Sequence, residues 1–118
     1  MNRVFREWVT FHQANPSVFG YIQRFAEQAI ATGRKRFSVY TIGHRVRWYV
    51  DIDTISSDGF KLNNNHLPFY ARLVVLLNGD KFKGFFQVRG GRWVDQVTDD
   101  QLLDAYHGRG PDNQRTLF

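Results

Sequence analysis

A chain of 118 residues can enclose one hydrophobic core but not two, so the sequence predicts a single domain. Apolar residues make up 42% of the chain and aromatic residues 16%, a composition that excludes an intrinsically disordered protein. The lack of cysteine excludes disulfides and zinc fingers. The formal charge of +5 favours a polyanion or an acidic protein surface as partner.

The two ends of the chain define its expected organisation. Arg3, Arg6 and Glu7 lie where a signal peptide would need an apolar core, and no apolar run approaches membrane-spanning length. We therefore expect a cytoplasmic protein that does not enter the membrane. Residues 1–107 are predicted to form the compact domain, and residues 108–118, which begin Gly-Arg-Gly-Pro, a flexible tail.

The first half of the chain predicts three helices. Val4, Trp8 and Phe11 recur at helical spacing and indicate a helix over about residues 3–13. A second helix is predicted over residues 16–32, with Asn15 as its cap and Pro16 in its first turn. A third follows over residues 38–50, capped by Ser38 or Thr41. Three basic residues of this helix lie largely off its apolar face: His44, Arg45 and Arg47.

The second half predicts a fourth helix, a hairpin and a last helix. Residues 47–62 alternate only partly, so they form either a small hairpin or an irregular loop. The fourth helix covers residues 64–78 and is capped by one of the asparagines 63–65. In KGFFQVR-GG-RWVDQV, two alternating runs flank a Gly-Gly turn, which predicts a β-hairpin over residues 83–97. Thr98 and Gln101 fit a capping box that opens the last helix.

These elements define an α+β fold, mostly helical, with four to five helices and a C-terminal hairpin. Their order over residues 16–97 resembles that of a winged helix-turn-helix domain, with the hairpin as its wing. One feature departs from that pattern, because about a dozen residues separate Tyr49 from Asn63 where a helix-turn-helix has about 3 to 4.

The winged-helix resemblance implies that the protein binds double-stranded DNA. The helix over residues 64–78 would then enter the major groove, and the wing tip would contact phosphates or the minor groove. A basic connection and the third helix would add contacts to the DNA backbone. The candidate groove-reading residues are Asn65, His66, Phe69 and Arg72; the wing residues are Arg89 and Arg92; the backbone contacts are Arg34, Lys35, Arg36, Arg45 and Arg47.

A second resemblance is to small proteins encoded by bacteriophages and prophages. It rests on the stretch DGFKLNNNHLPFYARL and on the later GFFQVR. This similarity implies a phage accessory or regulatory protein and transfers no site residue.

Each candidate also has a purely structural interpretation. Phe69 is a large aromatic ring in a small domain, where a core position is the commoner one. The asparagines 63–65 serve equally well as a turn and a helix cap. Arg89 and Arg92 are as well explained as solvated charges at a hairpin tip.

The sequence argues against an enzyme. Asp51 and Asp53 would share one side of a strand and could hold Mg²⁺ together with Asp58 or His66, but such a pair is mostly a solvated edge. The four histidines lack metal-site spacing, and neither a phosphate-binding loop nor a nucleophile elbow occurs. We therefore expect no catalysis, no cofactor and no metal.

The alternative function is a phage-encoded module that binds and redirects an acidic host protein. Exposed aromatic residues would mark it, since aromatic and arginine side chains dominate interface energies. The candidates are Phe85, Phe86, Trp93 and Phe118. A DNA reader of this type commonly acts as a homodimer on a two-fold site, so a homodimer is compatible with the first function.

Overall fold

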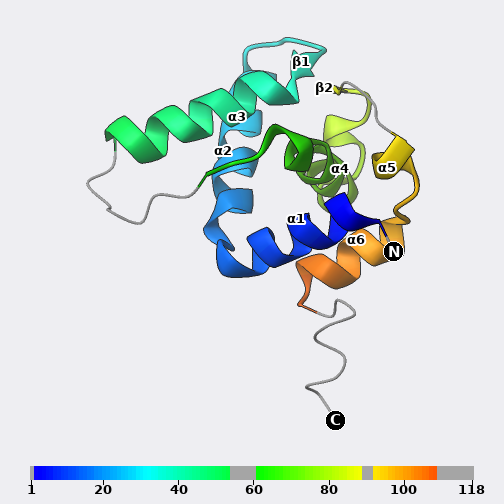
Figure 1. Cartoon of the computed structure of the whole chain (residues 1–118). Helices are drawn as coiled ribbons and strands as arrows, with labels where there is room; N and C mark the ends of the chain where they lie inside the picture. The colour runs from blue at the N-terminus through cyan, green and yellow to red at the C-terminus, as the bar shows by residue number, and fades with distance from the viewer. Residues whose placement is uncertain (1, 54–60, 89–91, 109–118) are drawn as a thin grey trace.

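The computed structural model describes residues 2–53, 61–88 and 92–108. Over these residues the chain is mostly helical with one short two-stranded sheet, which confirms the α+β class (Figure 1). The helices are α1 (Arg3–Ala14), α2 (Ser17–Ala31), α3 (Val39–Trp48), α4 (Leu67–Leu77), α5 (Arg92–Asp95) and α6 (Asp99–Tyr106). The strands are β1 (Phe37–Ser38) and β2 (Phe86–Gln87).

The first three helices match their predicted ranges to within about two residues, the usual uncertainty of a helix end. The Asn2 side chain caps α1 by accepting from the amides of Val4 and Phe5. Ser38 caps α3 by accepting from Tyr40. The predicted cap of α2 is wrong, because the Asn15 amide instead donates to the carbonyl of Phe11 at the end of α1. Sequence patterns thus located these helices well.

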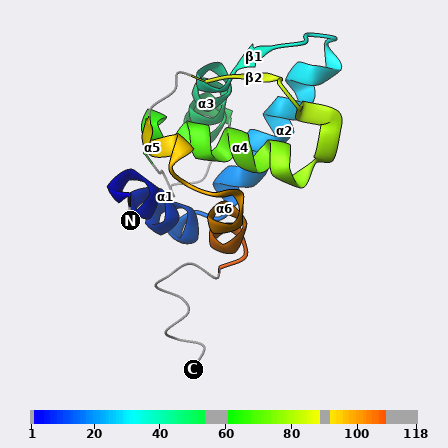
Figure 2. The same ribbon diagram turned by 90° about the vertical axis from the view of Figure 1, so that its right-hand side faces the viewer.

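Helix α4 is the centre of the fold. Its turns are buried on nearly every side, and Figure 2 shows it crossing the middle of the molecule, with α1 and α6 on one side and the strands on the other. A short 3-10 turn, η2 (Asn64–His66), leads into it, so the predicted helix over residues 64–78 is confirmed as a helical segment. A second 3-10 turn, η3 (Gly79–Phe82), follows. The core is therefore arranged around α4.

Helix α3 packs closely against α4 at Gly43. A Cβ atom on Gly43 would lie 2.6 Å from Cδ1 and 3.1 Å from Cδ2 of Leu67, which is itself fully buried. A side chain at position 43 would therefore require Leu67 to move.

The predicted hairpin over residues 83–97 is wrong in the part that the structure describes. Strand β2 pairs in parallel with β1, in the register Phe37 to Phe86, and residues 92–95 form α5. Val94 and Val97, three residues apart, are both buried. That spacing places both side chains on one face of a helical turn, whereas in a strand residues three apart point to opposite faces, so the positions of these valines favour the helix that forms. The wing is not confirmed, and residues 89–91 lie outside the described residues.

The remaining predictions have mixed outcomes. The predicted hairpin or loop over residues 47–62 is wrong at its start, because residues 47–48 belong to α3 and η1 (Tyr49–Asp53) continues it as a π-helical turn. Residues 61–62 have no helix or strand, and residues 54–60 lie outside the described part. The capping box at α6 is confirmed, since Thr98 and Gln101 bond each other's backbone amides at 3.1 and 2.8 Å. The predicted tail lies outside the described residues from residue 109 onward. None of the described helices is long and apolar enough to cross a membrane.

Candidate nucleic-acid interface

The helix expected to read bases lies inside the protein. Phe69 is 0% exposed, and its ring lies 5.6 Å from that of Phe5 and 5.3 Å from that of Trp8. His66 is also buried, 5.6 Å from the ring of Phe11. In this arrangement neither side chain has a surface from which to contact a base.

Arg72 is engaged within the protein. Its guanidinium donates to the carbonyl oxygens of Val94 and Val97, both at 2.8 Å, and to the Asp99 carboxylate at 2.7 Å. These bonds connect α4 to the end of α5 and to the first turn of α6. Arg72 thus has a clear structural role.

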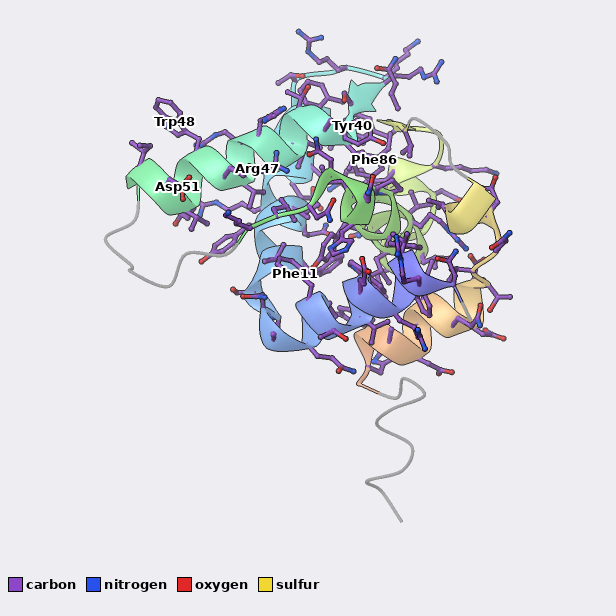
Figure 3. The ribbon with its side chains drawn as sticks, viewed as in Figure 1. Phe11, Tyr40, Arg47, Trp48, Asp51 and Phe86 are labelled. Carbon is purple, nitrogen blue, oxygen red and sulfur yellow. The ribbon has the colours of Figure 1, made fainter. Side chains whose placement is uncertain are left out.

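The asparagines before α4 lie at the surface. Asn65 is exposed, and the Asn63 side chain accepts from its backbone amide, which is the predicted cap. Asn64 accepts a 2.7 Å hydrogen bond from Arg47, whose guanidinium also donates to the carbonyl of Leu62 at 2.6 Å. Figure 3 shows Arg47 facing the chain segment that precedes α4. Arg47 therefore links this segment to α3.

The two wing residues cannot be located. Arg89 lies outside the described residues, and for Arg92 the structure describes only the backbone, at the start of α5. Among the four aromatic candidates, only the backbone of Trp93 is described, and Phe118 lies outside the described residues. The other two are core-associated, since Phe85 is buried and Phe86 stacks on Phe82 at 5.8 Å.

The four remaining DNA-contact candidates lie together in a strongly basic part of the chain. Residues 24–47 contain six of the 16 Lys and Arg residues but one of the 11 Asp and Glu residues. This stretch alone therefore accounts for the formal charge of +5, and the rest of the chain has ten residues of each sign. The exposed members, which we call the basic face, are Arg24, Arg34, Lys35, Arg36 and Arg45.

Three of these arginines lie against aromatic rings, and two of the three, Arg34 and Arg45, line one concavity. The guanidinium carbon of Arg45 lies 4.4 Å above the ring centre of Phe25, and that of Arg24 lies 5.6 Å from the same ring. The guanidinium of Arg34 lies 5.7 Å above Phe37. Such cation–π contacts position an arginine without neutralising it.

The concavity between α2, β1 and α3, which we call the arginine pocket, has a volume of about 300 Å³. Its walls combine aromatic and aliphatic surface with hydroxyl, amide and guanidinium groups, and no acidic residue lines it. The lining residues are Phe25, Gln28, Ala29, Thr32, Arg34, Phe37, Thr41, Ile42 and Arg45.

An exposed tryptophan extends this surface along α3. Trp48 is 59% exposed and follows Arg45 by one helical turn. In Figure 3 its indole points away from the body of the molecule. Ile52, on the following π-helical turn, is 62% exposed. Trp48 was not among the residues predicted to be functional, although its position on the helix opposite the buried Ile42 and Val46 indicates that it is exposed.

The titratable side chains of the core belong to the packing around α4 and not to this surface. Burial lowers the pKa of His12 and of His66, and the Glu7 carboxylate partly offsets the effect at His66. Burial raises the pKa of Tyr70. Both ring nitrogens of His66 lack a hydrogen-bond partner, and the Tyr70 hydroxyl lies 3.5 Å from Nδ1 of His12. Neutral forms of all three suit this environment.

The described residues offer no metal site. They contain no group of three or more His, Asp or Glu side chains close enough to hold an ion. Asp51 is exposed on the π-helical turn, whereas the side chain of Asp53 and all of Asp58 lie outside the description. Two of the four side chains considered for a magnesium site therefore lie outside the described residues.

Comparisons with models of protein families, with curated proteins and with solved structures found no match in any of the three.

Proposed function

We propose that this protein binds double-stranded DNA without catalysing a reaction, through the basic face and the exposed side of α3. The observation that carries the proposal is the concentration of the whole net charge in residues 24–47, where five of the six Lys and Arg side chains are exposed. Each phosphate neutralised by Lys or Arg releases counterions, and this release provides most of the affinity in non-specific binding. A localised basic surface is what such binding needs.

The exposed side of α3 provides a contact element of suitable size. An α-helix with its side chains is about 10–12 Å across, close to the width of the major groove, about 12 Å. Helix α3 carries Thr41, His44, Arg45 and Trp48 on its exposed side. The proposal thus keeps duplex DNA as the partner and uses α3 in place of the buried α4. The similarity to phage proteins leads us to propose a phage accessory or regulatory role.

The proposal is tested by titrating labelled duplex DNA at several salt concentrations. The affinity should fall steeply with salt, with a log–log slope of about 0.9 per phosphate contact. Lys35→Ala combined with Arg36→Ala should flatten this slope by about two units. A matched control, Arg3→Ala with Arg6→Ala, removes the same charge from exposed positions on α1. Equal loss in both double variants would contradict a localised interface, and absence of binding at low salt would overturn the proposal.

One observation favours a second function, the binding of a host protein. Trp48 and Ile52 are large apolar side chains exposed near one another along the chain, and tryptophan is enriched in interface hot spots. If the partner is a protein, Trp48→Ala should abolish capture of that protein and leave the salt dependence of DNA binding unchanged.

A further inference from the structure

The arginine pocket differs from the rest of the basic face because it joins charge to an apolar interior. Lys35 and Arg36 belong to the same connection but do not line it, whereas Arg34 and Arg45 do. Binding of DNA phosphates on an open surface needs only positively charged side chains. Apolar walls between the two guanidiniums indicate a ligand that has an apolar body as well as an anion.

The size and the walls of the pocket restrict that body. About 300 Å³ is the lower end of the range for small-molecule sites, roughly 300–1,000 Å³. The walls include the rings of Phe25 and Phe37, and guanidinium groups lie above both rings. Aromatic rings and arginine planes are the groups on which proteins stack unpaired nucleobases. A small planar ring therefore fits this site well.

The rim of the pocket can bind the anionic part of the same ligand. Arg34 and Arg45 come from two different elements and carry fixed positive charge, and no carboxylate lines the pocket to oppose an anion. Thr41 and Gln28 add a hydroxyl and an amide that can bond the polar edge of a base. Base and phosphate contacts are thus available within one concavity.

We propose that the arginine pocket binds one unpaired nucleotide, with the base against the walls and the phosphate on Arg34 and Arg45. This inference rests on the proposed DNA-binding function and sharpens it: the preferred DNA carries an unpaired nucleotide beside the duplex, at a single-stranded end or a bulge. The same chemistry would also hold a free nucleoside monophosphate. The experiment below separates the two sources.

The first arm compares a blunt duplex with the same duplex carrying a short single-stranded overhang, by fluorescence anisotropy at one salt concentration. Wild-type protein should bind the overhang DNA about tenfold more tightly, since stacking one base contributes about 1–3 kcal/mol. Ala29→Leu places extra volume in the pocket without changing charge and should remove the preference. Ala31→Leu adds the same volume at an exposed position of the same helix and should keep it.

The second arm uses thymidine monophosphate and, separately, inorganic phosphate, followed by NMR of the backbone amides. The nucleotide should shift the amides of residues 28–45 more than phosphate does, and Arg34→Ala should weaken it more than Arg36→Ala. Micromolar binding of the free nucleotide without an overhang preference would overturn the assignment to a DNA strand.

The outcomes distinguish the two proposals. Equal, tight binding of blunt and overhang DNA overturns the pocket assignment and leaves the DNA-binding function standing. A preference that survives in Ala29→Leu also overturns it. If neither DNA binds, the proposed function fails, and with it the assignment of the pocket to a DNA strand.

Discussion

Helices α3 and α4 are nearly equal in length and lie against each other, but the fold uses them in opposite ways. Helix α4 carries Arg72 as its only Lys, Arg, Asp or Glu residue and is buried on nearly every side. Helix α3 carries Arg45 and Arg47, buries one side and exposes the other, and extends to the edge of the molecule (Figure 1). A helix that is apolar all round belongs in the core, and the amphipathic one meets solvent and partners.

The comparison is tested most severely by truncating one aromatic residue from each helix. Phe69→Ala should lower the free energy of unfolding by about 3–5 kcal/mol, because it leaves a cavity between α1 and α4. Trp48→Ala should change it by less than about 0.5 kcal/mol, as expected at an exposed position. Urea denaturation followed by circular dichroism measures both. Similar losses of unfolding free energy in the two variants would contradict the difference in burial between α3 and α4.

A smaller effect is expected from the two arginines. Arg72→Ala should cost about 2 kcal/mol of stability, because two backbone carbonyl groups lose a charged donor; the exposed contact to Asp99 adds little. Arg72→Lys should recover less than half of this, since an ammonium group lacks the planar fork.

Arg45→Ala is the matched change on α3. It should lower the unfolding free energy by less than Arg72→Ala does, about 0.5–1 kcal/mol for the lost cation–π contact with Phe25, and lower the DNA affinity several-fold. If Arg72→Lys lowered the DNA affinity without lowering the free energy of unfolding, the result would indicate that α4, and not α3, contacts the DNA.

The smallest effect concerns pH. Burial lowers the pKa of His12 and of His66, so the unfolded chain takes up protons on these rings before the folded protein does. Stability should therefore be full above pH 6.5 and fall as the pH drops below it. The apolar replacement His66→Leu should reduce this loss. Thermal unfolding measured across this range provides the test, and a flat profile would contradict the burial of both rings.

Local signals were sufficient for the helices and their caps. The spacing of Val4, Trp8 and Phe11, the serine before α3 and the Thr98–Gln101 box each depend on contacts within a few residues, and sequence carries that information directly. Burial of α4 depends instead on which helices surround it. The polar Asn65 and Arg72 suggested an exposed side, but Asn65 precedes the helix and Arg72 bonds inward to carbonyl oxygens.

The pairing of β1 with β2 could not be predicted from local sequence patterns for a related reason. Strand β2 is two residues long and finds its partner in β1, far earlier in the chain, so the alternation in residues 83–88 gave no indication of which strand it would join. The candidate interface was only half predicted. Arg34, Lys35, Arg36 and Arg45 were named as supporting contacts, and counting charge by segment would have ranked them above α4.

At Gly43, the partly exposed helix α3 packs directly against the buried side chain of Leu67 on α4. This packing against the buried Leu67 restrains α3 before any ligand binds to its exposed side. Such stiffness lowers the entropy lost on binding, because the contact helix needs no further ordering. It also means that substitutions in the buried core can change the affinity of the exposed surface. Leu67→Ala would remove packing between α3 and α4. It should therefore lower the affinity for a partner that binds α3 without contacting Leu67.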